Sequence, residues 1–214
     1  MREIDLKSVK VVSWDIDGTM YDLHRLMSAF KRDLFRRMLS RNWPQAWRDF
    51  FRLLRFKRFM DRVRKRRGDY RVGPVPHRDR IAETQDEMYG RILPDLGAID
   101  GVKELLLWFE EKGVKQVVFS DYLASTKLTA LNFSDFFSGV YAGETIGHLK
   151  PARETFDHII DDLGIEPHQL LHIGDRLDTD AAAAPTVGYQ SLLLGGHHPT
   201  AREVFDQLIN DREE

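Results

Sequence analysis

The chain has 214 residues, which is enough for one sizeable α/β domain carrying a smaller insertion. It contains no cysteine, so disulfides, thiolate metal sites and thiol catalysis are excluded. The formal net charge of -2 hides a division, because residues 25–80 carry 19 Lys and Arg against 5 Asp and Glu.

The N-terminal residues carry charges and lack the apolar stretch of a signal peptide. No run of about 18 apolar residues occurs anywhere in the chain. We therefore expect a cytoplasmic protein without a transmembrane segment.

The first predicted element is a short strand over residues 9–14, which is rich in β-branched residues. Asp17-Gly18-Thr19 breaks it into a loop, so that the strand ends at carboxylates. From Leu23 to about Arg67, apolar residues recur every three or four positions with arginines between them. This spacing predicts amphipathic helices, interrupted near Asn42–Pro44.

Residues 68–77 contain two glycines and two prolines, which predicts a long loop, and a helical pattern returns over 79–92. From residue 101 onward, strand and helix patterns alternate. We expect helices at 102–112, 125–131, 152–163 and 178–184, and strands at 115–119, 139–142, 170–173 and 190–194. The alternation predicts a Rossmann-like three-layer core, in which helices cover both faces of a parallel sheet.

Three of the predicted strands are followed by polar side chains. Asp15 and Asp17 follow the first, Ser120 and Asp121 follow the strand at 115–119, and Asp175 follows the strand at 170–173. Because right-handed crossovers bring the carboxyl ends of parallel strands to one edge, we expect these groups to converge. Two carboxylates one residue apart in an extended segment point the same way, so one can attack while the other handles a proton.

Each motif alone has a simpler interpretation. Asp15 to Gly18 resembles a solvated turn or part of a calcium loop, although no Glu stands at the bidentate position. Lys150-Pro151 equally fits a helix start, and Asp121 or Asp175 could cap the helix that follows. Trp14 and His172 are assigned to packing or structural roles.

Taken together, four separated elements resemble the haloacid dehalogenase-like (HAD) hydrolase superfamily. They are Asp15-Ile16-Asp17-Gly18-Thr19, Ser120, Lys150-Pro151, and Gly174-Asp175 with Asp180, and they span residues 9–194. The resemblance is to the phosphatase branch with a helical cap between the first two motifs. It implies a catalytic core of residues 1–19 and 99–214 and a strongly basic cap of residues 20–98.

The resemblance also implies a role for each residue. Asp15 would be the nucleophile and Asp17 the general acid/base. Ser120, Asp121 and Lys150 would hold the phosphate. Asp15, Asp17 through its backbone carbonyl, and Asp175 would bind Mg²⁺, and Asp180 would support the metal site.

Charge explains why a metal is needed, since an anionic Asp15 attacking an anionic phosphoryl group requires a hard cation such as Mg²⁺. Asp17 favours phosphoryl transfer over dehalogenation, because a leaving alkoxide must be protonated whereas a halide leaves without a proton. We therefore expect a magnesium-dependent phosphomonoesterase that works through an aspartyl-phosphate on Asp15, acting on a small anionic phosphorylated metabolite.

Two alternatives stay open. A phosphomutase would use the same pair of aspartates. The second alternative places the function in the basic cap, where residues 62–67 hold five basic residues in six. The hypothesis is that cap residues 25–80 meet a polyanion, either a multiply phosphorylated substrate or an anionic macromolecule such as nucleic acid or a membrane surface.

Overall fold

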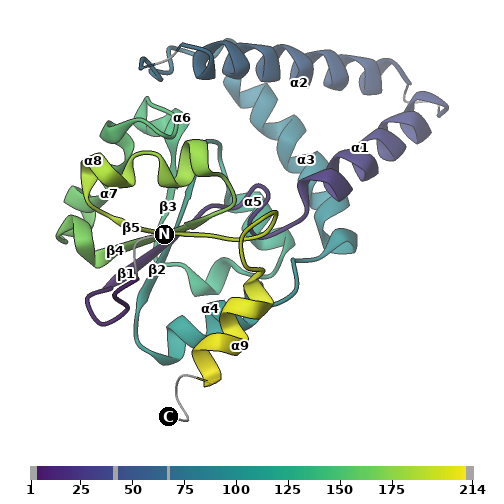
Figure 1. Cartoon of the computed structure of the whole chain (residues 1–214). Coiled ribbons are helices and arrows are strands. Elements are labelled where there is room, and N and C mark those ends of the chain that lie inside the picture. The colour runs from purple at the N-terminus through teal and green to yellow at the C-terminus, as the bar shows by residue number, and fades with distance from the viewer. Residues whose placement is uncertain (1–3, 41–42, 67, 211–214) are drawn as a thin grey trace.

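The computed structural model describes residues 4–40, 43–66 and 68–210. Their centre is a five-stranded sheet in the order β3-β2-β1-β4-β5, in which every pairing is parallel (Figure 1). The strands are β1 (Val11–Trp14), β2 (Lys115–Ser120), β3 (Val140–Ala142), β4 (Leu170–Gly174) and β5 (Gln190–Leu193). The predicted α/β class is confirmed, and all carboxyl ends of the strands lie at one edge.

Side chains alternate between the two faces of the sheet, because successive residues of a strand point in opposite directions. Val12 and Trp14 enter the cluster beneath α4 (Val102–Glu111), α5 (Ser125–Ala130) and α9 (Ala201–Asn210). Val11 enters the opposite cluster, beneath α7 (Arg153–Leu163) and α8 (Ala184–Val187). Trp14 is fully buried and packs edge-on against Phe109, so its expected packing role is confirmed.

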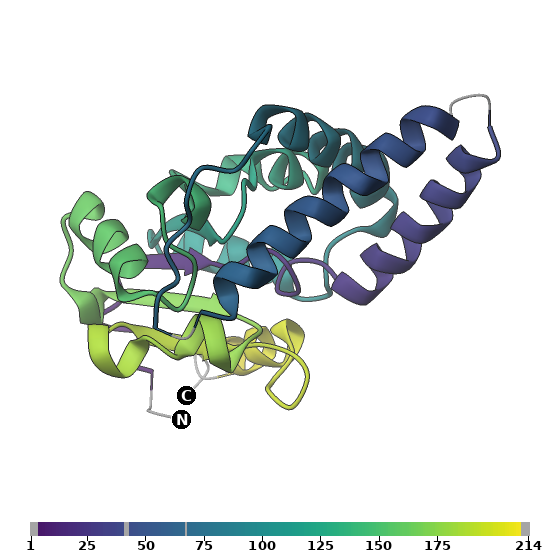
Figure 2. The same ribbon diagram turned by 90° about the horizontal axis from the view of Figure 1, so that it is seen from above.

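The insertion forms three helices, α1 (Leu23–Met38), α2 (Trp43–Arg64) and α3 (Arg78–Leu96), which contact one another. The side chain of Asp22 caps α1 by accepting from the backbone N of Arg25. Figure 2 shows α1 and α2 side by side as a hairpin that extends away from the sheet, while α3 returns to the core and contacts α5. The expected interruption falls between α1 and α2, although Asn42 itself lies outside the described residues, as does Arg67.

The structure differs from the predicted elements in three places. The predicted helix at 178–184 is wrong: Leu177–Ala181 form a π-helical turn, followed by α8. The Asp180 carboxylate is the physical reason, since it accepts from the backbone N of Arg176 and from Lys150 and so turns inward. The sequence pattern also missed α9 and the short helix α6 (Gly143–Ile146). Among the described residues, no helix is both long and apolar enough to cross a membrane.

Candidate active site

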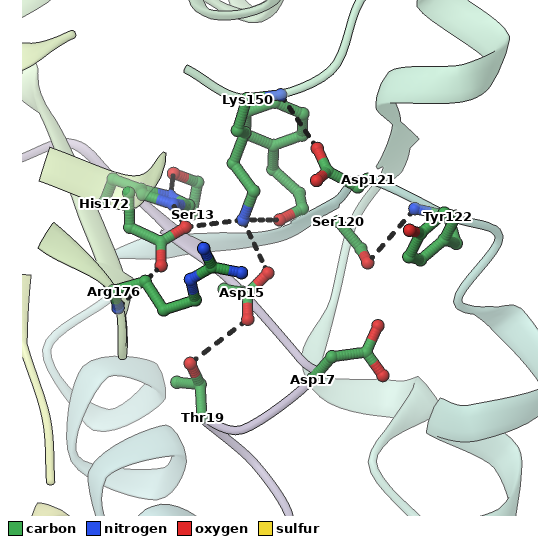
Figure 3. A network of polar contacts seen from close by, with 12 residues as sticks. Ser13, Asp15, Asp17, Thr19, Ser120, Asp121, Tyr122, Lys150, His172 and Arg176 are labelled. Atoms are coloured by element: carbon green, nitrogen blue, oxygen red, sulfur yellow. Dashed lines mark hydrogen bonds and ion pairs between the residues drawn. The ribbon is translucent and has the colours of Figure 1, made fainter. Parts of the chain in front are cut away.

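The predicted side chains gather at the carboxyl edge of the sheet (Figure 3). Asp15 follows β1 directly, and its backbone N donates to the carbonyl of Ile173 in the neighbouring β4 at 2.8 Å. Ser120 is the last residue of β2, and Asp175 follows the last residue of β4. Parallel pairing of β1 with both neighbours therefore brings Asp15 close to residues that are more than 100 positions away in the chain.

Asp15 is buried and held by two donors. Lys150 Nζ lies 2.5 Å from its Oδ1, and the Thr19 hydroxyl donates to its Oδ2 at 3.2 Å. Burial raises the pKa of Asp15 to about 7, although the Lys150 charge opposes this rise. A carboxylate in such a place is fixed in orientation and poorly solvated, which are two properties of a nucleophile.

Lys150 connects two of the carboxylates. Its Nζ also lies 2.6 Å from Asp180 Oδ1 and donates to the carbonyl of Phe119. Burial acts to lower the pKa of Lys150, but the neighbouring charges of Asp15 and Asp180 raise it above its usual range. The side chain is therefore a fixed positive charge. Lys150-Pro151 is not a helix start, because α7 begins only at Arg153.

Three carboxylates could hold a cation. One oxygen from each of Asp15, Asp175 and Asp180 lies within 4.8 Å of the others. Asp175 Oδ1 is buried and, among the described residues, lacks a hydrogen-bond partner, and burial raises the pKa of Asp175 to about 6. A buried acceptor without a donor, beside two further carboxylates, fits a hard divalent cation that takes oxygen ligands.

Two glycines permit this close approach. Gly18 has a φ of +100°, and a Cβ there would meet the Asp175 carboxylate. A Cβ at Gly174 would meet the side chain of Asp180. Both glycines therefore leave room for the carboxylates of the cluster.

Asp17 lies outside this cluster of side chains. Lys127 Nζ donates to both of its carboxylate oxygens, and the Tyr21 hydroxyl donates to Oδ1. Burial acts to raise the pKa of Asp17, but Lys127 and Tyr21 together lower it below its ordinary value. The pKa values of Asp15 and Asp17, two residues apart in the chain, are therefore shifted in opposite directions by their different surroundings.

Sequence reasoning missed Lys127, which is almost fully buried. One signal was available: Lys127 lies on the face of α5 that carries the buried residues Ala124, Leu128 and Leu131. A lysine among apolar neighbours on one helix face indicates an acidic partner, because a buried ammonium is costly unless paired.

Ser120 and Asp121 lie beside Lys150 at the end of β2. Ser120 is buried, and its Oγ accepts from the backbone N of Tyr122 at 3.4 Å. The Asp121 carboxylate accepts from the backbone N of Lys150 and from Arg64, each at 2.8 Å. Because its carboxylate is occupied and negatively charged, Asp121 can contact a phosphate only through its backbone N–H.

His172 has the structural role expected from its place in β4. One ring nitrogen lies 2.8 Å from the Ser13 hydroxyl and the other 3.2 Å from Asp180 Oδ1. Burial lowers the pKa of His172, which favours the neutral ring. Ser13 and His172 therefore hold the Asp180 carboxylate in its orientation.

A cavity of about 490 Å³ lies above these groups, between the three helices of the insertion and the sheet edge. Its floor includes Asp15, Asp17, Lys150 and Asp175, and its walls come from α1, α2 and α3. Two ion pairs join the insertion to the core beside it, Arg64 with Asp121 and Arg78 with Glu144. The carboxylates are therefore reached through a space that the inserted helices shape.

Comparison with known proteins agrees with this geometry. The family model of the haloacid dehalogenase-like hydrolases matches residues 9–188. A glyceraldehyde 3-phosphate phosphatase of Methanopyrus kandleri is 25% identical over 194 residues, covering 84% of this chain and 81% of the relative. A phosphoglycolate phosphatase of Chromobacterium violaceum is 26% identical over 204 residues, covering 90% of this chain and 87% of the relative.

Solved structures share the fold. A magnesium-bound HAD hydrolase of Bacillus subtilis superposes with a TM-score of 0.64 at 16% identity, covering 96% of this chain and 99% of the other. A Thermotoga maritima protein described as a β-phosphoglucomutase gives a TM-score of 0.62 at 15% identity, covering 94% of this chain and 99% of the other.

Proposed function

Since the chain belongs to the haloacid dehalogenase-like hydrolases, we propose that it is a magnesium-dependent phosphomonoesterase that acts through an aspartyl-phosphate on Asp15. The relatives named above are phosphatases, which supports hydrolysis of small phosphorylated molecules. The observation that carries the proposal is the contrast between two adjacent carboxylates. Asp15 is held by Lys150 beside a carboxylate cluster, and Asp17 is held separately by Lys127.

In the first step, a carboxylate oxygen of Asp15 attacks phosphorus and the bond from phosphorus to the leaving oxygen breaks. The Lys150 ammonium, the Ser120 hydroxyl and the backbone N–H of Asp121 are the proposed donors to the phosphoryl oxygens. Asp17, which must first take up a proton against the effect of Lys127 and Tyr21 on its pKa, gives that proton to the leaving alkoxide, which departs as the alcohol. The phosphoryl group is then bound to Asp15.

In the second step, the ionised Asp17 takes a proton from water while the water oxygen attacks phosphorus. The bond between Asp15 and phosphorus breaks, inorganic phosphate leaves and both aspartates return to their starting states. Lys127 and Tyr21 hold the Asp17 carboxylate in position for both transfers, because both donate to it.

The proposed Mg²⁺ ligands are Asp15, Asp175 and the backbone carbonyl of Asp17, with Asp180 supporting the site. When bound, the cation neutralises charge on the phosphoryl oxygens. The fit rests on the buried, unpaired Asp175 Oδ1 and on the all-oxygen donor set.

We further propose that residues 20–98 act as a cap over a core formed by residues 1–19 and 99–214. The supporting observation is the cavity whose floor is the carboxylate edge and whose walls are α1, α2 and α3. A cap in that place excludes water from the transferring phosphoryl group.

The alternatives receive less support. The named relatives favour hydrolysis over phosphomutase chemistry. The comparisons give no support to a polyanion or membrane contact through residues 25–80. Several of the cap arginines are also paired within the molecule, among them Arg37, Arg52, Arg64 and Arg78.

The test compares the wild type with Asp15→Asn, with the exposed Asp135→Asn as a matched control. Release of phosphate from 4-nitrophenyl phosphate is measured with Mg²⁺ and with chelator. We expect turnover by the wild type and by Asp135→Asn that is lost in Asp15→Asn and in chelator. Equal phosphate release by Asp15→Asn would contradict the proposal.

A second variant tests the covalent intermediate. In Asp17→Asn, the aryl alcohol still leaves because it needs little protonation, whereas the water that should follow has no base. We expect intact-protein mass spectrometry after acid quench to find one added phosphoryl group on Asp17→Asn and none on the Asp15→Asn, Asp17→Asn double variant. Isomerised sugar phosphate without release of phosphate would instead identify a mutase.

A further inference from the structure

The walls of the cavity above the carboxylates are apolar. On α1, Leu23, Leu26, Met27 and Phe30 line it, and they recur at the three- and four-residue spacing that places side chains on one face of a helix. On α2, Phe50, Leu53 and Leu54 line it with the same spacing. Part of the apolar stripe of these amphipathic helices therefore faces the cavity.

Three of these side chains lie outside the hydrophobic clusters of the described residues, although the Phe50 ring also meets the rings of Trp47 and Phe51 on its own helix. Met27 is 43% exposed, and Phe50 and Leu54 are half-buried. None of the three belongs to a buried hydrophobic cluster of the described residues or to the partly buried shell packed against one. Apolar surface left in contact with water inside a catalytic cavity is unfavourable until a ligand covers it.

Each cation that lines the cavity has an acidic partner, although Arg64 Nε is buried without a hydrogen-bond partner among the described residues. Among the described residues that line it, Lys57 pairs with Asp61, Arg64 with Asp121 and Arg176 with Asp178. Lys150 is held by Asp15 and Asp180 at the floor, where the phosphate is expected to bind. A carboxylate or second phosphate on the substrate would compete with these acidic partners everywhere except at Arg64 Nε, whereas an apolar group displaces no ion pair.

Resting on the proposed function, we infer that the substrate is a phosphate monoester of an alcohol with an apolar alkyl or aryl part. The phosphate lies at the carboxylate floor, and the alkyl or aryl part lies between α1 and α2 against Met27, Phe50 and Leu54. A volume of about 490 Å³ is within the range of sites that enclose an organic ligand.

Two esters of matched length test this inference. Hexyl phosphate and sorbitol 6-phosphate are both six-carbon esters of a primary alcohol, and they differ in the hydroxyl groups along the chain. We expect kcat/KM to be roughly tenfold or more higher for hexyl phosphate. From propyl to hexyl phosphate it should rise by up to about fourfold per methylene, which corresponds to ~0.8 kcal/mol for each buried CH₂.

Near-isosteric variants test whether side chains of the cavity wall cause the preference for hexyl phosphate. Leu54→Asn and Met27→Gln keep side-chain size and should each lower kcat/KM for hexyl phosphate roughly fivefold or more, while methyl phosphate is unaffected. Leu39→Asn is the control, because Leu39 is 74% exposed and does not line the cavity. An equal loss on methyl and hexyl phosphate in both cavity variants would overturn the inference.

Binding provides a readout that does not depend on turnover. Calorimetry with Asp15→Asn and Mg²⁺ should give tighter binding of hexyl phosphate than of sorbitol 6-phosphate. Equal or tighter binding of sorbitol 6-phosphate or phosphoglycolate would overturn the inference while leaving the hydrolase proposal standing. Tighter binding of hexyl phosphate, with no Asp15-dependent phosphate release from any ester, would overturn the hydrolase proposal alone.

Discussion

Lys127 donates to both carboxylate oxygens of Asp17, at 2.7 Å and 2.6 Å, although 110 positions separate the two residues. Its ammonium also lies 4.8 Å from the centre of the Tyr89 ring, which belongs to α3. The proposed general acid/base is therefore positioned by the core helix α5, at the point where α3 packs against it.

We expect Lys127→Met to lower kcat by roughly tenfold or more, which is part of the 10²–10⁴-fold that general acid–base catalysis supplies, with little change in KM. Loss of the ammonium also raises the pKa of Asp17, because Lys127 opposes the effect of burial. The limb of the pH–rate profile that belongs to Asp17 should move to higher pH. Lys103→Met, at an exposed position of α4, is the control. An unchanged pH profile would show that Lys127 does not act through Asp17.

Magnesium should stabilise the protein more at about pH 8 than at about pH 5.5. Burial raises the pKa of Asp15 to about 7 and of Asp175 to about 6, so both hold protons more tightly when folded than when unfolded. Without metal, both groups therefore reduce stability as the pH rises from their unfolded values through these pKa values. At low pH the cation must displace these protons, whereas at high pH it meets ionised carboxylates.

Thermal unfolding with and without Mg²⁺ at both pH values measures this difference. At about 100 times the dissociation constant, the metal should add ~2.7 kcal/mol at the higher pH. Asp175→Asn should lose most of this gain, and the exposed Asp135→Asn should keep it. A gain independent of pH would place the cation away from Asp15 and Asp175.

Gly18→Ala should abolish magnesium-dependent activity. A Cβ there would meet the Asp175 carboxylate, and the φ of +100° is unfavourable for any side chain. Gly113→Ala separates backbone strain from the contact with Asp175. Gly113 also has a positive φ, but an added Cβ there meets nothing within 4 Å. Both variants should lose ~1–2 kcal/mol of stability from backbone strain, and only Gly18→Ala should lose activity. Full activity in Gly18→Ala would show that Asp175 is not constrained by that contact.

Arg78→Met should destabilise the protein by about 1–3 kcal/mol in urea unfolding. Arg78 donates to both oxygens of Glu144, a mostly buried carboxylate. Without Arg78, the donor that remains to it among the described residues is the backbone N of Leu123. Arg153→Met is the matched control, since its pair with Asp157 is exposed and should be worth less than ~1 kcal/mol. Equal losses in the two variants would show that the joint between the insertion and the core adds no particular stability.

The sequence predicted those residues of the site that directly follow or end a strand. Asp15, Ser120 and Asp175 each stand at the carboxyl end of a strand, and parallel pairing brings such residues to one edge whatever their distance in the chain. Lys150 was found only through the order of the motifs, because its Pro151 neighbour fits a helix start equally well. The polar residues at 178–180 were misassigned to a helix, because periodicity does not register that the Asp180 carboxylate binds Lys150.

By itself, the amino-acid sequence determined the α/β class, the helical insertion and the carboxylate edge, because strand alternation and helix periodicity are properties of neighbouring residues. Only the tertiary structure decided that Lys127 pairs with Asp17, that Asp180 turns inward and that the apolar stripes of α1 and α2 line a cavity above Asp15. Periodicity states which face of an element a side chain occupies. The partner of that face depends on how distant segments pack. In this protein, that packing places apolar walls around the cavity above the proposed nucleophile.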